Sequence, residues 1–196
     1  LGQEITGIDV SMEWLVIARH LAEHYGGSPR LAAGFAERLP LADNSVAAIV
    51  SLDVIEHVGD QDAYVSDLRR VLKPGGFFAL STPNRFSLSP EPHVNVWGVG
   101  YLPRPLQARY VKLVRNQPYT FTRLLSVWET KRLFSGARGF DARVVFPAIP
   151  EHELSGFTSS RKRLALIYNW LVGIPLTKLF LPFFGAYYRV WGNIKN

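Results

Sequence analysis

Asp9 is the first residue of the chain whose type and setting indicate chemistry. It lies at the end of a short apolar stretch, Ile5–Val10, directly before a segment with helical spacing. In nucleotide-binding α/β folds, a carboxylate at this place accepts hydrogen bonds from the two ribose hydroxyls of a cofactor. A glycine-rich turn normally lies about 20 residues earlier. Because the chain begins at Leu1, we expect a nucleotide-binding domain that is truncated at its N-terminus and therefore a fragment.

The composition excludes several kinds of site. The 196 residues contain no cysteine, which excludes disulfides, thiol nucleophiles and zinc fingers. The five histidines show no ligand-like spacing, so we predict that the protein holds no metal. No signal peptide is recognisable, and we expect a cytoplasmic protein. A chain that is 47% hydrophobic and 19% charged is expected to form one globular domain.

The C-terminal part is basic and apolar. The net charge is +6, and the acidic residues lie mainly in the first half of the chain. Arg161, Lys162 and Arg163 precede a long apolar stretch that proline and glycine divide into short pieces. These pieces are too short for a membrane-spanning helix, which needs about 20 apolar residues. They suit peripheral contact of segment 161–191 with a membrane, but packing on the sheet or in a dimer also explains them.

The hydrophobic pattern predicts an α/β fold with a doubly wound, mostly parallel sheet. The stretch Val46–Leu52 is apolar almost throughout, as expected for a parallel strand buried on both faces. Residues 1–150 are expected to form the domain, with 84–125 as an aromatic lid or substrate insertion, and 151–196 to form a hydrophobic helical segment with a last strand at 188–194. The other expected strands are Ile5–Val10, Leu31–Ala36, Phe77–Thr82 and Phe140–Phe146, and the expected helices are Met12–Tyr25, Asp60–Leu72 and Ser126–Ser135.

Five short motifs occur in an order that resembles a known family. They are Gly7-Ile8-Asp9-Val10-Ser11, Ala36-Glu37-Arg38-Leu39-Pro40-Leu41, Ser51-Leu52-Asp53-Val54-Ile55-Glu56-His57-Val58, Leu68-Arg69-Arg70-Val71-Leu72-Lys73-Pro74-Gly75-Gly76 and Ser81-Thr82-Pro83-Asn84-Arg85. Together they resemble the class I S-adenosylmethionine-dependent methyltransferases, in the type 11 group that includes ubiquinone and menaquinone biosynthesis enzymes. The resemblance implies a Rossmann-like fold that here lacks the first strand and the glycine-rich turn.

The resemblance also implies the cofactor, S-adenosyl-L-methionine, and the residues that bind it. Asp9 would hold the ribose hydroxyls, or else supply a helix-terminal charge. Val10 and Met12 would pack on the adenine face. The turn at Ala36 and Glu37 would line the adenine edge, although Glu37 is equally well explained as an exposed turn residue. The remaining cofactor-binding residues, near the methionine moiety, are Ser51, Leu52 and Asp53, of which Asp53 is alternatively a helix cap.

Two histidines are candidates for the catalytic base. His57 follows the strand end at the implied point of methyl transfer, and His93 lies in the expected lid. Histidine changes its charge near neutral pH, so either could deprotonate a hydroxyl or amine acceptor. The resemblance also implies a structural use for the Glu56-His57 pair. Many such enzymes need no base, because alignment of donor and acceptor supplies much of the rate.

The sequence therefore predicts a methyltransferase that acts on an oxygen, nitrogen or carbon atom of a small molecule. The basic, apolar tail and the aromatic lid favour a lipid-like, quinone-like or envelope-glycan acceptor, and no nucleic-acid module is recognisable. Whether this chain is itself active stays open. The alternatives are a noncatalytic membrane-surface binding module with the same fold and, less favoured, an NAD(P)-dependent oxidoreductase.

Overall fold

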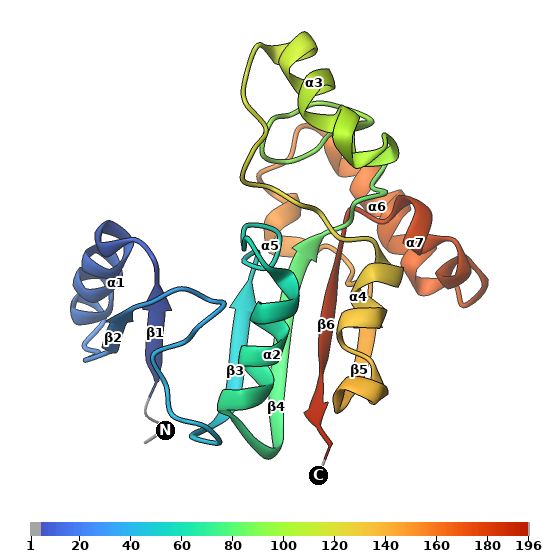
Figure 1. Ribbon diagram of the computed structural model, residues 1–196. Helices are drawn as coiled ribbons and strands as arrows, with labels where there is room; N and C mark the ends of the chain where they lie inside the picture. The colour runs from blue at the N-terminus through green and yellow to red at the C-terminus, as the bar shows by residue number, and fades with distance from the viewer. Residues whose placement is uncertain (1–4, 196) are drawn as a thin grey trace.

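The computed structural model describes residues 5–195 and arranges them around two separate β-sheets (Figure 1). The smaller sheet pairs β1 (Thr6–Asp9) with β2 (Arg30–Ala33) in parallel, and α1 (Met12–His24) connects them. The larger sheet has the strand order β3-β4-β6-β5. Its strands are β3 (Val46–Leu52), β4 (Leu72–Pro83), β5 (Phe140–Val145) and β6 (Tyr187–Ile194). The predicted alternation of strands and helices is confirmed.

The larger sheet is mixed, because its last strand runs against both neighbours. β3 and β4 are parallel, whereas β6 is antiparallel to β4 and to β5. The predicted strand at 188–194 therefore exists, but it lies inside the sheet between β4 and β5. Its residues alternate between buried and exposed, and Tyr188 and Val190 are fully buried. The C-terminal part of the chain is thus an integral part of the fold.

Side-chain caps mark the first residues of three helices. The Ser11 hydroxyl accepts a hydrogen bond from the Trp14 backbone N–H at the start of α1. The Asp60 carboxylate does the same for the backbone of α2 (Gln61–Val71), and Ser126 forms a capping box with Glu129 at α4 (Val127–Leu133). The other helical segments are η1 (Val99–Tyr101), α3 (Arg104–Arg115), η2 (Gly136–Arg138), α5 (Glu151–Leu154), α6 (Ser159–Gly173), η3 (Leu176–Leu179) and α7 (Leu181–Phe184).

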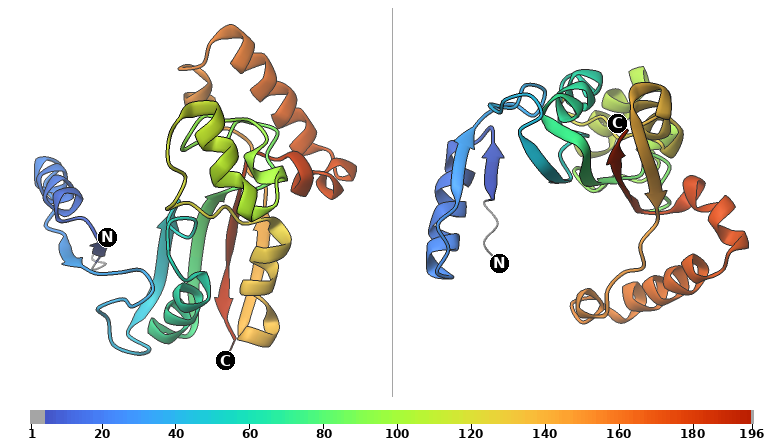
Figure 2. Two further views of the ribbon diagram at one scale, coloured as in Figure 1. Left: turned by 45° about the horizontal axis from the view of Figure 1, so that its top comes forward. Right: turned by 90° about the horizontal axis from the view of Figure 1, so that it is seen from below.

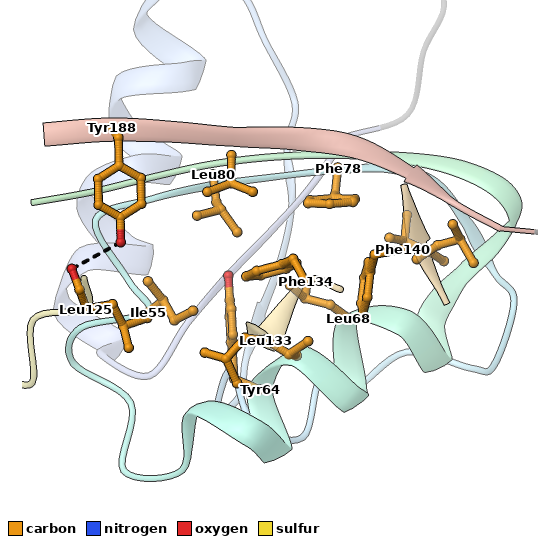
Figure 3. Close-up of a cluster of buried hydrophobic side chains, with 14 of the residues drawn as sticks. Ile55, Tyr64, Leu68, Phe78, Leu80, Leu125, Leu133, Phe134, Phe140 and Tyr188 are labelled. Atoms are coloured by element: carbon orange, nitrogen blue, oxygen red, sulfur yellow. Dashed lines mark hydrogen bonds between the residues drawn. The ribbon is translucent and has the colours of Figure 1, made fainter. Parts of the chain in front are cut away.

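The main core lies between one face of the four-stranded sheet and the helices α2 and α4 (Figure 3). Three phenylalanine rings pack at its centre, with Phe78 stacked on Phe134 and Phe140 in edge contact with both. The Tyr188 hydroxyl is fully buried near the carboxyl end of β4. It donates to the Leu125 carbonyl at 3.1 Å, and the Thr130 hydroxyl lies 2.6 Å away. This side chain therefore joins the last strand to the start of α4.

β3 is an edge strand, and this corrects the expectation that it is buried on both faces. In the described residues its one neighbour in the sheet is β4. Val50 and Leu52 are 68% and 64% exposed although both are apolar. β1 and β2 stand apart from this free edge (Figure 2). The apolar run thus predicts a strand correctly. Whether that strand is buried depends on a second neighbouring strand, which the apolar run does not specify.

The helices of the C-terminal part stand away from the four-stranded sheet (Figure 2). On α6, Ala165 is the buried residue, whereas Leu164, Ile167 and Trp170 are 67%, 54% and 66% exposed. Among the described residues, no helix is long and apolar enough to cross a membrane. The apolar side chains of this helix therefore face outward instead of completing the core.

Replacement of Tyr188 by phenylalanine tests the link between β6 and α4. Tyr188→Phe removes the hydroxyl contacts with Leu125 and Thr130, although the Leu125 carbonyl still accepts from the Arg85 backbone N–H at 3.0 Å. We therefore expect a loss of about 0.5 to 1.5 kcal/mol in the free energy of unfolding. Urea denaturation measures this loss. Tyr25→Phe, at a residue that is 79% exposed, is the control and should change stability little. Equal stability of both variants would show that the buried hydroxyl contributes nothing.

Candidate functional site

The predicted site residues cluster at the carboxyl ends of parallel strands. β1, β3 and β4 point the same way in Figure 1, toward the side on which α3 lies. Asp9 ends β1, Asp53 follows β3, and Ser81 is near the end of β4. Open α/β sheets bind their ligands at this edge. Asp53 and Ser81 therefore share one edge of the four-stranded sheet, whereas Asp9 ends a strand of the separate two-stranded sheet.

Asp53 joins the ends of β3 and β4. Its backbone N–H donates to the Ser81 carbonyl at 3.0 Å, and its Oδ1 accepts from the Ser81 hydroxyl at 2.9 Å. The residue has a φ of 53°, in the left-handed region that non-glycine residues rarely occupy. Backbone strain of this kind gathers at functional sites. Asp60, not Asp53, caps the following helix, so the alternative of a simple helix cap is wrong.

Asp9, Val10 and Met12 form an exposed group where β1 passes into α1. Val10 and Met12 are 62% and 63% exposed, and their apolar side chains are open to contact with a ligand. Asp9 accepts a hydrogen bond from the Ser11 backbone N–H at 2.7 Å through Oδ1. The carboxylate thus has a fixed direction and keeps acceptor capacity for further donors.

The turn at Ala36 and Glu37 is tied to the larger sheet and its helix. Glu37 Oε1 accepts from the Gly59 backbone N–H at 2.8 Å, which links the turn to the loop after β3. Asp67 accepts from the Leu39 backbone N–H at 2.6 Å, and Arg70 donates to the Leu39 carbonyl at 3.0 Å. These contacts give Glu37 a structural use and hold the turn beside the β3 end.

Ser51 and Leu52 differ in their surroundings at the end of β3. The Ser51 hydroxyl accepts from the Tyr64 hydroxyl at 2.8 Å. Burial raises the pKa of Tyr64 to about 12, so this phenol stays protonated and keeps its hydrogen to donate. The Leu52 side chain, in contrast, is exposed. Of the two, Ser51 is positioned by the core.

The two candidate bases, predicted separately from the sequence, meet in the structure. The Nε2 atoms of His57 and His93 are 3.1 Å apart, and the rings meet edge to face at 4.7 Å between centroids. His93 Nδ1 lies 2.5 Å from Glu91 Oε1, and His57 Nδ1 lies 3.2 Å from the Phe121 carbonyl. His93, in the segment 84–125, therefore contacts His57 in the loop after β3.

Glu56 and Glu91 lie beside the two histidines; the family resemblance implied only a structural use for Glu56 with His57, and the sequence did not single out Glu91. Glu56 is 1% exposed, and its Oε2 accepts from the Thr82 hydroxyl at 3.0 Å. Burial raises the pKa of the Glu56 carboxyl, although a backbone hydrogen bond and Thr82 oppose this. Its Oε1 atom is buried without a hydrogen-bond partner. Glu91 is 4% exposed. In the sequence, Glu56 directly precedes His57 and Glu91 lies two residues before His93. This proximity was the available signal.

The segment 84–125 lies above the carboxyl ends of β3 and β4 (Figure 1). It has a small core of its own, formed by Val96, Val99, Val111 and Tyr119. Exposed aromatic residues of this segment, of α4 and of α7 contact one another, with Trp97 stacked on Tyr101 and Trp128 against Phe183. The Tyr101 hydroxyl donates toward the Phe86 and Phe183 carbonyls. An aromatic wall therefore stands beside the strand ends.

Glu129 anchors this segment to the domain. Its carboxylate accepts from Arg104 and from the Ser126 backbone N–H, and it lies 3.8 Å from Arg85. Burial alone would raise the pKa of the Glu129 carboxyl, but the hydrogen bonds from Ser126 and Arg104 outweigh burial and hold that pKa below its ordinary value. The ionised form of Glu129 is thus the form that the folded structure favours.

Comparison with known families finds a match for the N-terminal part. The family described as "Methyltransferase domain" matches residues 1–80. This range contains every residue predicted to bind the cofactor, together with His57. It does not contain the segment with His93 or the C-terminal part.

Two similar proteins carry related descriptions. A probable S-adenosylmethionine-dependent methyltransferase of Mycolicibacterium smegmatis is 56% identical over 52 residues, which is 26% of this chain and 20% of that protein. A ubiquinone biosynthesis O-methyltransferase of Maricaulis maris is 32% identical over 118 residues, 59% of this chain and 46% of that protein. The matched part of the chain therefore spans less than half the length of these two relatives.

A solved structure shows the same fold along almost the whole chain. It is an S-adenosylmethionine-dependent methyltransferase from Mesorhizobium loti, with a TM-score of 0.61 and 17% sequence identity, and it covers 97% of this chain and 80% of that one. The likeness confirms the Rossmann-like α/β fold class.

Replacement of Glu129 tests how the lid segment is anchored. Glu129→Gln removes a carboxylate whose pKa is lower in the folded state, so we expect a loss of about 1 to 3 kcal/mol in the free energy of unfolding at pH 7. A lowered pKa stabilises the fold above the unfolded value, near 4.5, and this stabilisation disappears as the pH falls through the folded value. Urea denaturation from pH 7 to pH 3 should therefore show the two proteins converging in acid. A constant difference would contradict this assignment.

Proposed function

We propose that the protein transfers a methyl group from S-adenosyl-L-methionine to a small-molecule acceptor, because residues 1–80 match the family described as "Methyltransferase domain" and similar proteins are described as S-adenosylmethionine-dependent methyltransferases. The single observation that carries the proposal is the family match over residues 1–80, which spans the complete set of predicted cofactor residues. The acceptor atom is an oxygen, nitrogen or carbon.

The positions of the residues support a division of labour in cofactor binding. In this proposal Asp9 accepts hydrogen bonds from the two ribose hydroxyls, since its carboxylate is exposed and oriented by Ser11. The open side chains of Val10 and Met12 cover the adenine face, and Ala36 and Glu37 line its edge. Ser51, Leu52 and Asp53 hold the methionine part.

Methyl transfer in this site rests mainly on alignment. The sulfonium carbon is already a strong electrophile, so holding donor and acceptor in line lowers most of the barrier. Where the acceptor must lose a proton, His57 and His93 are the proposed bases. Their Nε2 atoms face each other, and each Nδ1 is held by a fixed acceptor. Such orientation is what a general base requires.

The acceptor class is proposed from the surfaces around the strand ends. The aromatic wall formed by Trp97, Tyr101, Trp128 and Phe183 suits a flat or apolar molecule. On the C-terminal part, α6 exposes Leu164, Ile167 and Trp170 directly after a basic cluster. A helix of this kind binds at the surface of an anionic membrane. We therefore propose a lipid-like or quinone-like acceptor, with an envelope glycan as the other candidate, and peripheral membrane contact through 161–191.

Asp9→Asn tests cofactor binding. The asparagine keeps the Oδ1 acceptor for Ser11 but loses the charge that strengthens the ribose hydrogen bonds. Such bonds contribute about 1.5 to 3 kcal/mol, so S-adenosylhomocysteine should bind about 10- to 100-fold more weakly. Calorimetry on the full-length protein measures the dissociation constant.

Glu13→Gln is the matched control, because Glu13 is an exposed acid in the first turn of the same helix. It should bind the ligand as tightly as the unaltered protein. Unchanged binding by Asp9→Asn would disprove the ribose assignment. No binding by the unaltered protein would disprove the cofactor proposal and favour a noncatalytic binding module.

Flotation with anionic vesicles tests the membrane contact. A truncation before α6 is unsuitable, because it removes β6 from the middle of the sheet. Instead, Arg161, Lys162 and Arg163 are replaced together by glutamate. Each basic residue near an anionic surface contributes about 1 kcal/mol, so we expect most of the protein to remain unbound.

The control carries the same three charge reversals at exposed positions on β4 and α4. Its substitutions are Lys73→Glu, Lys131→Glu and Arg132→Glu. This control should float like the unaltered protein. If both triple variants float equally, the C-terminal part does not mediate membrane binding, and its apolar face packs against protein.

A further inference from the structure

We propose that Glu56, His57 and His93 together bind one divalent transition-metal ion, for which zinc is the best fit. One potential ligand atom from each residue lies within 4.8 Å of the other two. The sequence predicted no protein-held metal, because the two histidines are 36 positions apart and follow no ligand spacing. The fold brings them together by placing the lid segment on the end of β3.

The hydrogen bonds at the two Nδ1 atoms determine where the imidazole lone pairs point. The Phe121 carbonyl can only accept, so His57 Nδ1 carries a hydrogen and donates to it. The Glu91 carboxylate likewise accepts from His93 Nδ1. In the neutral rings both Nε2 atoms then carry a lone pair, and these face each other at 3.1 Å. Two facing lone pairs repel each other, and a metal ion or a hydrogen on one Nε2 relieves this repulsion.

The distance between these nitrogens suits two ligands of one metal ion. Zinc binds histidine nitrogen at about 2.0 to 2.1 Å, so two such nitrogens at the tetrahedral angle lie about 3.3 to 3.4 Å apart. The two Nε2 atoms are 3.1 Å apart, a few tenths of an ångström from that value. A small rotation of the His93 ring, which is 27% exposed, closes the difference.

Glu56 supplies the negative charge and the third ligand. Its Oε1 atom is buried and has no hydrogen-bond partner, while Oε2 accepts from Thr82. A buried carboxylate oxygen without a partner is costly, and metal coordination is one of the ways in which proteins satisfy it. Imidazole and carboxylate together are the donor set of many three-ligand zinc sites. The orphaned oxygen is the second, independent observation that points to a cation here.

The residues behind the histidines are arranged as in established metal sites. Metal-ligating histidines usually donate their other N–H to a carboxylate or a backbone carbonyl, which fixes the ring. Here Glu91 serves His93 and the Phe121 carbonyl serves His57. Glu91 is itself held, since its Oε2 accepts from the His93 and Val94 backbone N–H groups at 2.9 Å. The support for the site is therefore built into the lid.

A bound ion would have two consequences. Three protein ligands leave a position open for a water or for an oxygen or nitrogen atom of a small molecule. A bound ion would also connect the segment 84–125 to the loop after β3 through His93. Metal binding at both Nε2 atoms and a general base at the same atoms are mutually exclusive. Occupation by metal would therefore replace the base role proposed above, and metal binding is testable without any methyl transfer.

The experiment measures metal binding to the full-length protein after treatment with a chelator. Titration with Zn²⁺ in a calorimeter should show one site, and Co²⁺ in its place should give visible d–d absorption that reports a low-coordinate nitrogen and oxygen site. His57→Ala and His93→Ala should each weaken Zn²⁺ binding by about 100-fold or more. Glu91→Gln, which weakens the support of His93 and removes no proposed ligand, should weaken Zn²⁺ binding by about 10- to 100-fold.

Two further measurements separate the site from nonspecific binding and from misfolding. His152→Ala removes an exposed histidine on α5 and should bind Zn²⁺ as the unaltered protein does. Zn²⁺ should raise the melting temperature of the unaltered protein and of His152→Ala, but not of His93→Ala. Circular dichroism confirms that each variant is folded. Absence of a Co²⁺ spectrum in the unaltered protein, or equal Zn²⁺ affinity in folded His93→Ala, would overturn the proposal.

Discussion

The pairing of β6 between β4 and β5 is the constraint on which the rest of the structure depends. β6 comes from the end of the chain, yet it pairs with β4 from Phe77 to Pro83. Tyr188 of β6 also forms hydrogen bonds with Thr130 on α4 and with the carbonyl of Leu125, just before the N-cap of that helix. Without this strand, β5 would have no partner in the sheet and the core in Figure 3 would lose one wall. The C-terminal part is therefore required for the site, although the matched family range ends at residue 80.

The same pairing determines where the lid segment begins. The Asn84 side chain, directly after β4, donates to the Pro182 and Gly185 carbonyls just before β6. The Asn84 backbone N–H donates to the Ala186 carbonyl. The lid leaves the sheet at a point where three hydrogen bonds hold it to the end of the chain. This fixed departure is what allows a residue of the lid, His93, to reach a residue that follows β3.

Two buried carboxylates give the site its electrostatic character. Glu56 is buried in the loop after β3, and Glu91 is buried in the segment 84–125. Each is beside a histidine, and the two histidines meet between them. Ionised side chains are rarely buried without a partner. The group is therefore difficult to explain as packing alone, and the proposals for a base and for a metal both arise from it.

The sequence by itself predicted many of the elements and a resemblance to methyltransferases. Val46–Leu52 was predicted with its observed bounds, and the helices expected to begin at Met12 and Ser126 begin at Met12 and Val127, because hydrophobic period and helix breakers are local properties. Asp9 and Asp53 were likewise placed at strand ends. Only the tertiary structure decided what those elements touch. The exposure of β3, the internal position of β6 and the meeting of His57 with His93 depend on contacts between residues far apart in the chain, and local sequence does not encode such contacts.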